Sequence, residues 1–218
     1  MTKIKRALIS VWDKSGVVDI ADFLHKNNIE IISTGGTSKI INDAKIPTVD
    51  VADITSQKEI MNGRVKTLHP NIFGGILADR NNSSHVNDLS DMNLDTIDIV
   101  IINLYPFKNE AVEKNLDLKN AIEFIDIGGP SMLRAAAKNF EHVIPLCSPV
   151  QYDKFMQLYT DNNGMINIED RACFAKEVFS LTLGYDIMIN RYFQEKTNNF
   201  NEINLSYIKN KDLRYGEN

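Results

Sequence analysis

Apolar residues in the first fifty positions follow two different periods. Residues 6–11 form a short, nearly continuous apolar run typical of a buried strand, and residues 17–27 repeat their apolar positions with the spacing of an amphipathic helix. Short strands at 30–33 and 47–51 and a helix at 38–44 continue the alternation. Strands that alternate with helices in this way favour a parallel sheet covered by helices.

The rest of the chain resumes this pattern after a long interruption. Residues 53–80 have weak periodicity and are rich in Gly, Asn and Thr, which predicts a functional loop with room for short helices, and the polar residues 81–93 predict a surface excursion. The remaining elements are expected to be buried strands at 98–103 and 143–146, helices at 118–125, 131–139, 149–159 and 169–196, and an edge strand at 203–208.

A glycine-rich segment between a predicted strand and a predicted helix is the first candidate site. In Ser33-Thr34-Gly35-Gly36-Thr37, the glycines let backbone N–H groups approach an anion, and the start of the helix adds positive potential. An ordinary turn has the same composition, and neither GxGxxG nor GK[ST] is present, so a dinucleotide or Walker-type site is a poor fit. Ser10 and Lys14 follow the first strand at the same sheet edge, where parallel sheets bind ligands.

Three further groups of polar residues follow predicted strands or precede a predicted helix. Arg64 and Lys66 lie in the long loop, and Asn103 and Tyr105 follow the strongest strand. The segment 126–130, Asp-Ile-Gly-Gly-Pro, precedes a helix with Pro130 as its first residue, which predicts an oxyanion-type site with a carboxylate beside it. On that helix, the spacing of Ser131, Arg134 and Lys138 places them on one face, opposite Met132, Ala135 and Ala136. A capped helix with a cationic surface stripe is the alternative.

Composition narrows the classes of protein. The 218 residues carry a net charge of −5, which argues against a general nucleic-acid binder but allows a small anionic ligand in a locally positive pocket. Cys147 and Cys173 lack CxxC spacing and have apolar neighbours, so both are expected to be reduced structural thiols in a cytoplasmic protein. No signal peptide or membrane-spanning run is indicated. The four histidines are scattered, His69 before Pro70 favours a structural role, and no metal motif is found.

Six motifs in one order carry a family resemblance: residues 10–16, 33–37, 63–70, 103–107, 126–129 and 133–139. Together they resemble the amino-terminal domain of the bifunctional purine biosynthesis proteins, over essentially the whole chain. The resemblance implies a methylglyoxal-synthase-like α/β fold, with a parallel five-stranded sheet flanked by helices and a C-terminal helical extension. Residues 1–200 would form the domain. Residues 201–218 would begin a linker to a truncated formyltransferase domain, whose activity and 10-formyltetrahydrofolate cofactor are expected to be absent here.

The activity implied by the resemblance is inosine monophosphate (IMP) cyclohydrolase. It closes the ring of 5-formamidoimidazole-4-carboxamide ribotide to give IMP, the last step of de novo purine biosynthesis, without a cofactor or metal. A cytoplasmic homodimer with a purine nucleotide as ligand, but with no nucleic acid or membrane partner, is implied. Lys138 would donate or accept a proton, assisted by Lys66, Tyr105 and Asp126. The implied nucleotide contacts are Ser10, Trp12, Asp13, Lys14, Thr34, Gly35, Gly36, Thr37, Arg64, Val65, Thr67, Ile102, Asn103, Ile127 and Gly128.

Two departures and two alternatives accompany this hypothesis. Trp12 stands where a small residue is expected, and Phe73 stands where many relatives have histidine. The alternative functions on the same fold are a methylglyoxal-synthase-like enzyme and a nucleotide-sensing regulatory domain. Both need a phosphate site, but the methylglyoxal synthase family is shorter and lacks the motif at 64–70. A sensing domain would not need Lys66, Tyr105, Asp126 and Lys138 together.

Overall fold

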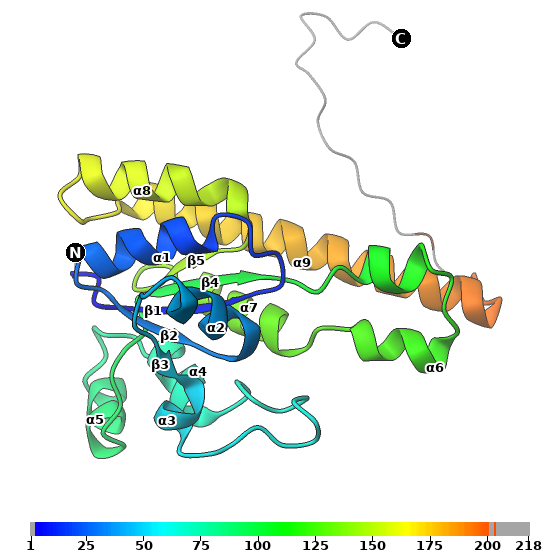
Figure 1. The fold of residues 1–218 in the computed structure, drawn as a ribbon, viewed down its shortest axis with the longest axis horizontal. Helices are drawn as coiled ribbons and strands as arrows, with labels where there is room; N and C mark the ends of the chain where they lie inside the picture. The colour runs from blue at the N-terminus through cyan, green and yellow to red at the C-terminus, as the bar shows by residue number, and fades with distance from the viewer. Residues whose placement is uncertain (1–2, 201–202, 204–218) are drawn as a thin grey trace, which may run out of the picture.

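A parallel sheet forms the centre of the structure (Figure 1). The computed structural model describes residues 3–200 and residue 203. Within that part of the chain, five strands pair in the order β3-β2-β1-β4-β5, and every pairing is parallel. The strands are β1 (Arg6–Val11), β2 (Glu30–Ser33), β3 (Val49–Asp50), β4 (Ile99–Asn103) and β5 (Ile144–Leu146). The expected five-stranded parallel sheet is thereby confirmed.

The apolar runs of the strands are continuous because both faces of the sheet are buried. Along β4, Ile99 and Ile101 join the core on one face, and Val100 and Ile102 join the core on the other. The neighbouring strand β1 alternates in the same way. A strand covered on both sides needs apolar residues at every position, which explains why the sequence shows runs instead of alternation.

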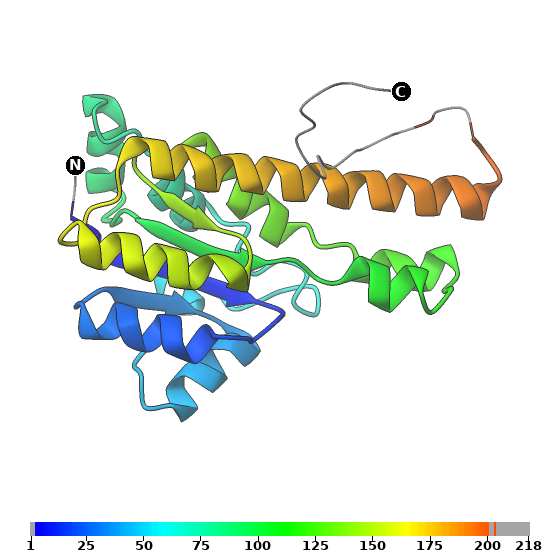
Figure 2. The same cartoon turned by 90° about the horizontal axis from the view of Figure 1, so that it is seen from above.

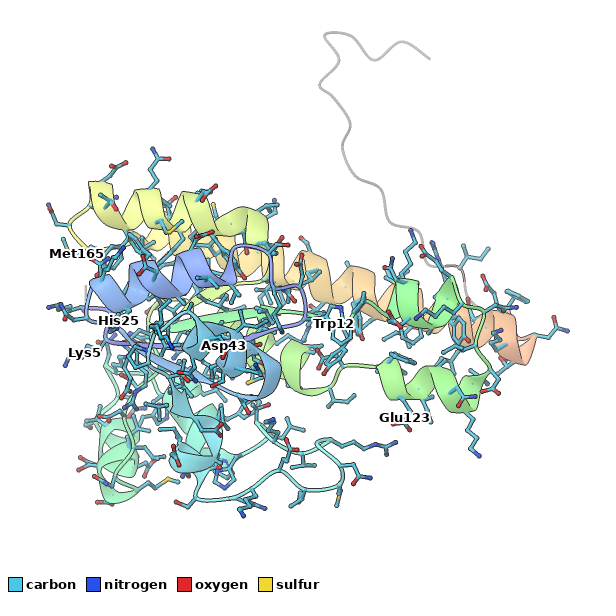
Figure 3. All side chains as sticks on the ribbon, in the orientation of Figure 1. Lys5, Trp12, His25, Asp43, Glu123 and Met165 are labelled. Carbon is cyan, nitrogen blue, oxygen red and sulfur yellow. The ribbon has the colours of Figure 1, made fainter. Side chains whose placement is uncertain are left out.

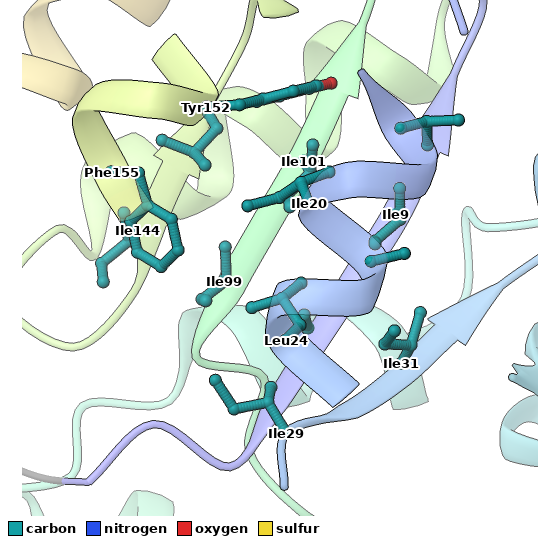
Figure 4. Packing of buried hydrophobic residues seen from close by; sticks show 14 of the residues in the cluster. Ile9, Ile20, Leu24, Ile29, Ile31, Ile99, Ile101, Ile144, Tyr152 and Phe155 are labelled. Atoms are coloured by element: carbon teal, nitrogen blue, oxygen red, sulfur yellow. The ribbon is translucent and has the colours of Figure 1, made fainter. Parts of the chain in front are cut away.

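Helices cover both faces. The first face carries α1 (Val17–Lys26), α2 (Gly35–Asp43) and α8 (Tyr152–Asp161). Figure 4 shows Ile20 and Leu24 of α1 against Ile9, Ile31 and Ile101 of the sheet. The opposite face carries α3 (Val51–Thr55), α4 (Pro70–Leu77), α7 (Gly128–Lys138) and the first part of α9 (Ile168–Thr197).

The long helix α9 continues well beyond the sheet. Its 30 residues span about 45 Å, and its second half packs against residues 107–125, here called the arm. The arm consists of a π-helical turn (Lys108–Val112), α6 (Leu118–Ala121) and a 3₁₀ turn (Ile122–Phe124). Figures 1 and 2 both show α6 beside the far part of α9, past the end of the sheet. A third apolar cluster joins them: Phe107, Ala111, Ala121, Tyr185 and Tyr192. The C-terminal helical extension is therefore present.

Several expected boundaries were wrong. The helix α2 begins at Gly35, so the Gly-Gly segment is its first turn and not a separate connection before residue 38. Likewise α7 begins at Gly128, which makes Pro130 its third residue, where a proline still removes no internal helical bond. Val51 starts α3, so β3 keeps only two residues.

Other expectations changed in kind. Residues 81–93 contain a helix, α5 (Ser83–Asp91), whose single buried residue is Leu89, too weak an apolar signal to predict it. The segment expected as one helix at 149–159 starts with a 3₁₀ turn (Pro149–Gln151). The predicted edge strand at 203–208 lies outside the described residues, apart from residue 203. Among the described helices, none combines the length and apolar content needed to cross a bilayer.

The two cysteines lie in different surroundings. Cys147 is 6% exposed at the end of β5, where its N–H donates to the Gln151 side chain at 2.6 Å. Cys173 lies on the exposed side of α9, so the expected apolar setting was wrong for this residue. Burial, together with the Glu177 carboxylate, raises the pKa of the Cys147 thiol to about 11.

We expect a thiol reagent to modify Cys173 and spare Cys147 in the native protein. The thiolate is the reactive form, and both burial and the raised pKa deplete it at Cys147. Titration with Ellman's reagent near neutral pH should therefore give one thiol per chain before denaturation and two after it. The Cys173→Ser variant should give none in the native state, and rapid native labelling of that variant would contradict the prediction.

Candidate active site

The loops that follow β1 and β4 meet where the strand order of the sheet reverses, which is where α/β sheets open a ligand crevice. The Asn103 side chain joins them. Its carbonyl oxygen accepts hydrogen bonds from the N–H groups of Trp12, at 2.6 Å, and Asp13, at 2.8 Å, and its amide donates to the Asp13 carbonyl at 2.9 Å. Asn103, which was expected as a ligand contact, therefore binds the backbone of the loop after β1 in the free protein.

An anion-binding arrangement lies at the start of α2. Thr34 precedes this helix, and its buried hydroxyl has no hydrogen-bond partner among the described residues. The first N–H groups of a helix also lack internal partners and carry partial positive charge. An anion with several oxygen atoms placed there would accept hydrogen bonds from the Thr34 hydroxyl and from these N–H groups.

Two lysines flank this helix start. Lys14 donates a hydrogen bond to the Thr37 hydroxyl at 3.0 Å and another to the Val11 carbonyl, and burial lowers its pKa although Asp13 opposes the shift. The Lys66 ammonium lies 3.4 Å from the position that a Cβ atom of Gly35 would take. Gly35 has φ +57°, so a side chain there would be strained and would crowd the lysine.

A cleft of about 270 Å³ opens beside this helix start. Its far wall comes from the strand end and the aperiodic loop, where Glu59 pairs with Lys66 at 2.7 Å. Sequence reasoning missed this wall, because residues 57–59 belong to no motif and only the fold brings them to the cleft. The lining residues are Thr34, Gly35, Asp50, Val51, Ala52, Gln57, Lys58, Glu59 and Lys66.

The start of α7 carries the second polar group. The Asp126 carboxylate accepts a hydrogen bond from the Gly129 N–H at 2.9 Å. A Cβ atom on Gly129 would lie 2.5 Å from the other carboxylate oxygen, so only glycine fits. Burial raises the pKa of Asp126, opposed by the N–H groups of Gly129 and Tyr105. Thr67 reaches this helix start, with its hydroxyl 3.1 Å from the Cβ position of Gly128. The loop around Lys66 and Thr67 therefore connects the starts of α2 and α7.

An aromatic pair borders the crevice. The rings of Trp12 and Tyr105 have centroids 4.7 Å apart and are tilted by 47°, and each residue is 46% exposed. Figure 3 places Trp12 at the end of the sheet from which α9 and the arm project. Trp12, which is unexpected at this position, thus packs against Tyr105, which is expected to assist the proton transfer.

Lys138 is not brought to these residues within one chain. It is the last residue of α7, ten positions after Gly128, which corresponds to about 15 Å along the helix axis. Its side chain lines a groove of about 620 Å³ between α7 and α9, with Lys176, Phe179 and Leu183 among the other lining residues. Arg134 lies over the Phe179 ring, 5.6 Å from its centroid.

The other expected site residues occupy varied positions. Arg64 is exposed and pairs with Glu123 of the arm, and Val65 forms a bridge with Ile60 in the loop. Ile102 is buried in the core, which leaves only its backbone at the site, whereas Ile127 is 58% exposed. Ser10 is half-buried in β1.

The histidine next to Pro70 has a structural role, as expected. The His69 ring nitrogen Nδ1 accepts a hydrogen bond from the Asn71 N–H at 3.2 Å and caps α4. Phe73 packs against the second core. Within residues 3–200 and 203, no group of three or more His, Cys, Asp or Glu side chains is placed to hold a metal ion.

The fold and the two polar helix starts define the class of MGS-like domains. The profile of that family, described as "MGS-like domain", matches residues 16–131, and the chain belongs to it. A second profile, "AICARFT/IMPCHase bienzyme", matches residues 136–218. Among solved structures, one titled "Crystal structure of ForH" is similar, with a TM-score of 0.78 and 32% identity over 88% of this chain and 98% of that one.

The curated relatives are named "Bifunctional purine biosynthesis protein PurH". The protein of this name from Clostridium botulinum (strain Hall) is 47% identical over 99% of this chain. The proteins from Fusobacterium nucleatum and Acetivibrio thermocellus are 47% and 45% identical over 98% and 99% of the chain, respectively. The chain spans 42% of the length of each of these relatives.

We expect the Asp126→Asn variant to gain stability relative to the wild type as the pH rises. Because the folded state raises the pKa of Asp126, ionisation is more costly in the folded than in the unfolded chain. The penalty is absent below the ordinary carboxyl pKa, grows as the pH rises toward the raised value, and is constant above it. Thermal melting between about pH 4 and 8 should show the difference in Tm increasing and then levelling.

Asp79 provides a control of opposite sign. Hydrogen bonds from the Asn81 N–H and the His142 ring lower the pKa of this carboxyl, so its ionised form is favoured by folding. The Asp79→Asn variant should lose stability relative to the wild type at neutral pH, and the loss should shrink on acidification. A difference in Tm that does not change with pH for Asp126→Asn would show that burial does not penalise its charge.

Proposed function

We propose that this domain is an IMP cyclohydrolase, which closes the ring of 5-formamidoimidazole-4-carboxamide ribotide with loss of water. The observation that supports it most directly is that one loop, through Lys66 and Thr67, reaches the starts of two different helices. The start of α2 suits a phosphate, and the start of α7 carries a carboxylate beside the first backbone N–H groups of that helix. The bienzyme profile and the purine biosynthesis relatives support the same activity.

The phosphate of the ribotide would bind at the start of α2. Backbone N–H groups of Gly35, Gly36 and Thr37 supply donors, and the Thr34 hydroxyl, which lacks a partner, supplies another. Lys14 and Lys66 add positive charge on either side. Phosphate binding to Lys66 would compete with the ion pair between Lys66 and Glu59. That ion pair would hold the Lys66 side chain in the cleft until the ligand binds.

Ring closure would then take place near the start of α7. The carboxamide nitrogen attacks the formyl carbon, a C–N bond forms, and the formyl oxygen gains negative charge. Backbone N–H groups near Gly128 can stabilise this charge. Asp126, made more basic by burial, accepts the amide proton, which passes to the formyl oxygen to give a hydroxyl. A lysine then protonates this hydroxyl, so the C–O bond breaks and water leaves while the neighbouring ring nitrogen loses its proton and forms the C=N bond. Holding nitrogen and carbon in contact can contribute about 7–11 kcal/mol. Tyr105 lies at the rim as a hydrogen-bond donor to the substrate.

These steps need neither a metal nor folate. A folate cofactor, 10-formyltetrahydrofolate, belongs to the formyltransferase activity proposed for the longer protein. We infer that residues 1–200 form the cyclohydrolase domain and that residues 201–218 lead toward that second part. The bienzyme profile, which runs across this boundary, supports the continuity.

The direct test is the conversion of the formylated ribotide, followed by ultraviolet absorbance without folate or metal. We expect IMP to form and Asp126→Asn to lower kcat by about a hundredfold or more, because the proton acceptor is lost. Lys14→Met should raise KM with a smaller change in kcat, because the phosphate contact is made in substrate and transition state alike.

Lys39→Met is the matched control for Lys14. Lys39 is exposed on α2 and pairs with Asp43 at the C-terminal end of that helix, so its loss should leave both constants unchanged. Tight binding of IMP without any turnover would instead indicate a nucleotide-sensing module and would overturn the proposed activity.

We also propose that the active form is a homodimer in which Lys138 acts on the site of the second copy. Lys138 lies too far along α7 to reach Asp126 of its own chain. It borders an apolar groove in which Phe179 is 43% and Leu183 is 58% exposed, the kind of surface that a second copy covers. The closed symmetry of a dimer would place two such lysines equivalently.

A mixing experiment tests this arrangement. Lys138→Ala and Asp126→Asn should each be nearly inactive alone. When the two are refolded together, half of the dimers are mixed and contain one intact site, so about a quarter of the wild-type activity should return. No recovery would exclude action across copies, and normal turnover by Lys138→Ala alone would remove this lysine from the mechanism.

A further inference from the structure

A tyrosine outside the crevice holds the loop that carries Asp126. Tyr185 lies on the part of α9 that extends past the sheet, and its hydroxyl oxygen accepts a hydrogen bond from the Asp126 N–H at 2.9 Å. The same hydroxyl donates to the Phe124 carbonyl at 3.2 Å. One phenol, 59 positions further along the chain than Asp126, therefore ties the end of the arm to the residue that lies two positions before α7.

The phenol is fixed by its surroundings. Tyr185 is 6% exposed and belongs to the apolar cluster between α9 and the arm. Its ring meets Phe107 edge-on, with centroids 6.4 Å apart and planes at 72°. Phe107 comes two residues after Tyr105, so the same cluster also anchors the turn that carries Tyr105.

The ionisation state of Tyr185 suits a double hydrogen-bonding role. Burial raises the pKa of its phenol to about 12, so the hydroxyl keeps its proton at any pH at which the protein works. It can then donate and accept at the same time. Asp126 is thus held at two points, by Tyr185 through its backbone and by Gly129 through its carboxylate.

We infer that Tyr185 is a positioning residue for the ring closure, because it sets where the Asp126 carboxylate lies relative to the start of α7. This inference rests on the proposed function. A shift of the carboxylate by a fraction of an ångström would leave phosphate binding at α2 intact but would spoil proton transfer at the other end of the substrate. The expected effect is therefore on kcat and not on KM.

The helix offers a matched pair of substitutions. Tyr192 lies seven positions further along α9, in the same cluster, with its ring also edge-on to Phe107 at 5.4 Å. Its hydroxyl donates to the Leu116 carbonyl in the middle of the arm, away from Asp126. Tyr185→Phe and Tyr192→Phe each remove one buried hydroxyl and keep the ring, so both should lower thermal stability to a similar degree.

We expect Tyr185→Phe to lower kcat by about ten- to a hundredfold with KM within about twofold of the wild type. Tyr192→Phe should keep a kcat close to the wild type. Equal losses of kcat in both variants would reduce Tyr185 to a merely structural role and overturn the inference, and so would a wild-type kcat in Tyr185→Phe.

A second measurement does not depend on turnover. Carbon-detected NMR titration of the Asp126 carboxyl should show a raised pKa in the wild type that returns toward the ordinary carboxyl value in Tyr185→Phe, because a loosened loop admits water. Tyr192→Phe should leave it unchanged. If the wild type binds IMP but forms none, the proposed function fails, while this titration still decides whether Tyr185 positions the Asp126 carboxylate. An Asp126 titration that is the same in all three proteins overturns it.

Discussion

The parallel pairing of β1 with β4 is the constraint on which the site depends. This pair runs from Ala7 opposite Ile99 to Val11 opposite Asn103, and it is buried on both faces. Because parallel strands end at the same edge, the loop after β1 and the loop after β4 must emerge together, although 90 residues separate Asp13 from Asn103. The Asn103 side chain then converts this proximity into a fixed geometry by bonding to the backbone of the first loop. The crevice is therefore a consequence of strand order. Its polar residues are carried by loops that the sheet edge holds in place.

An acidic chain can present a cationic site because the charges at that site are local. The protein has a net charge of −5, yet the start of α2 combines helix partial charges with the ammonium groups of two lysines that flank it. Lys66 is balanced by Glu59, and Lys14 has Asp13 beside it. These acidic neighbours limit repulsion between the cations before a ligand binds, and they act over distances shorter than the screening length of about 8 Å. The overall charge of a protein consequently says little about the charge of its binding pocket.

Residue patterns predicted those parts of the structure that depend on local chemistry. The strands were visible because burial on both faces requires apolar runs, as in 98–103, and the segments 33–37 and 126–130 were recognisable because glycines beside helix starts serve a backbone need. The walls of the site were not predicted, because Glu59 comes from a segment without periodicity and Asp50, although it ends a predicted strand, belongs to no site motif. The helix α5 was missed, since a polar helix on the surface has almost no apolar stripe. The spacing of Ser131, Arg134 and Lys138 correctly gave a common side of α7, but a shared side says nothing about distance along the axis, and Lys138 lies a full helix length from Asp126.

The extension of α9 past the sheet has a physical reason, which is that it packs against the arm. A helix that only covered the sheet would end near Val178 and Thr182, which are the last buried residues of α9 before the part of the helix that packs against the arm. The further turns bury Tyr185 and Tyr192 against the arm, which has too few apolar residues to fold by itself. The arm in turn adjoins two candidate site residues: Phe107 lies two residues after Tyr105, and Phe124 lies two residues before Asp126. The residues proposed to carry out the chemistry are therefore fixed by a small apolar cluster outside the main core. The proposed phosphate site, by contrast, is built at the end of the strands. Two parts of the structure thus serve the proposed substrate: the sheet edge would hold the phosphate, and the α9–arm pair would position the carboxylate.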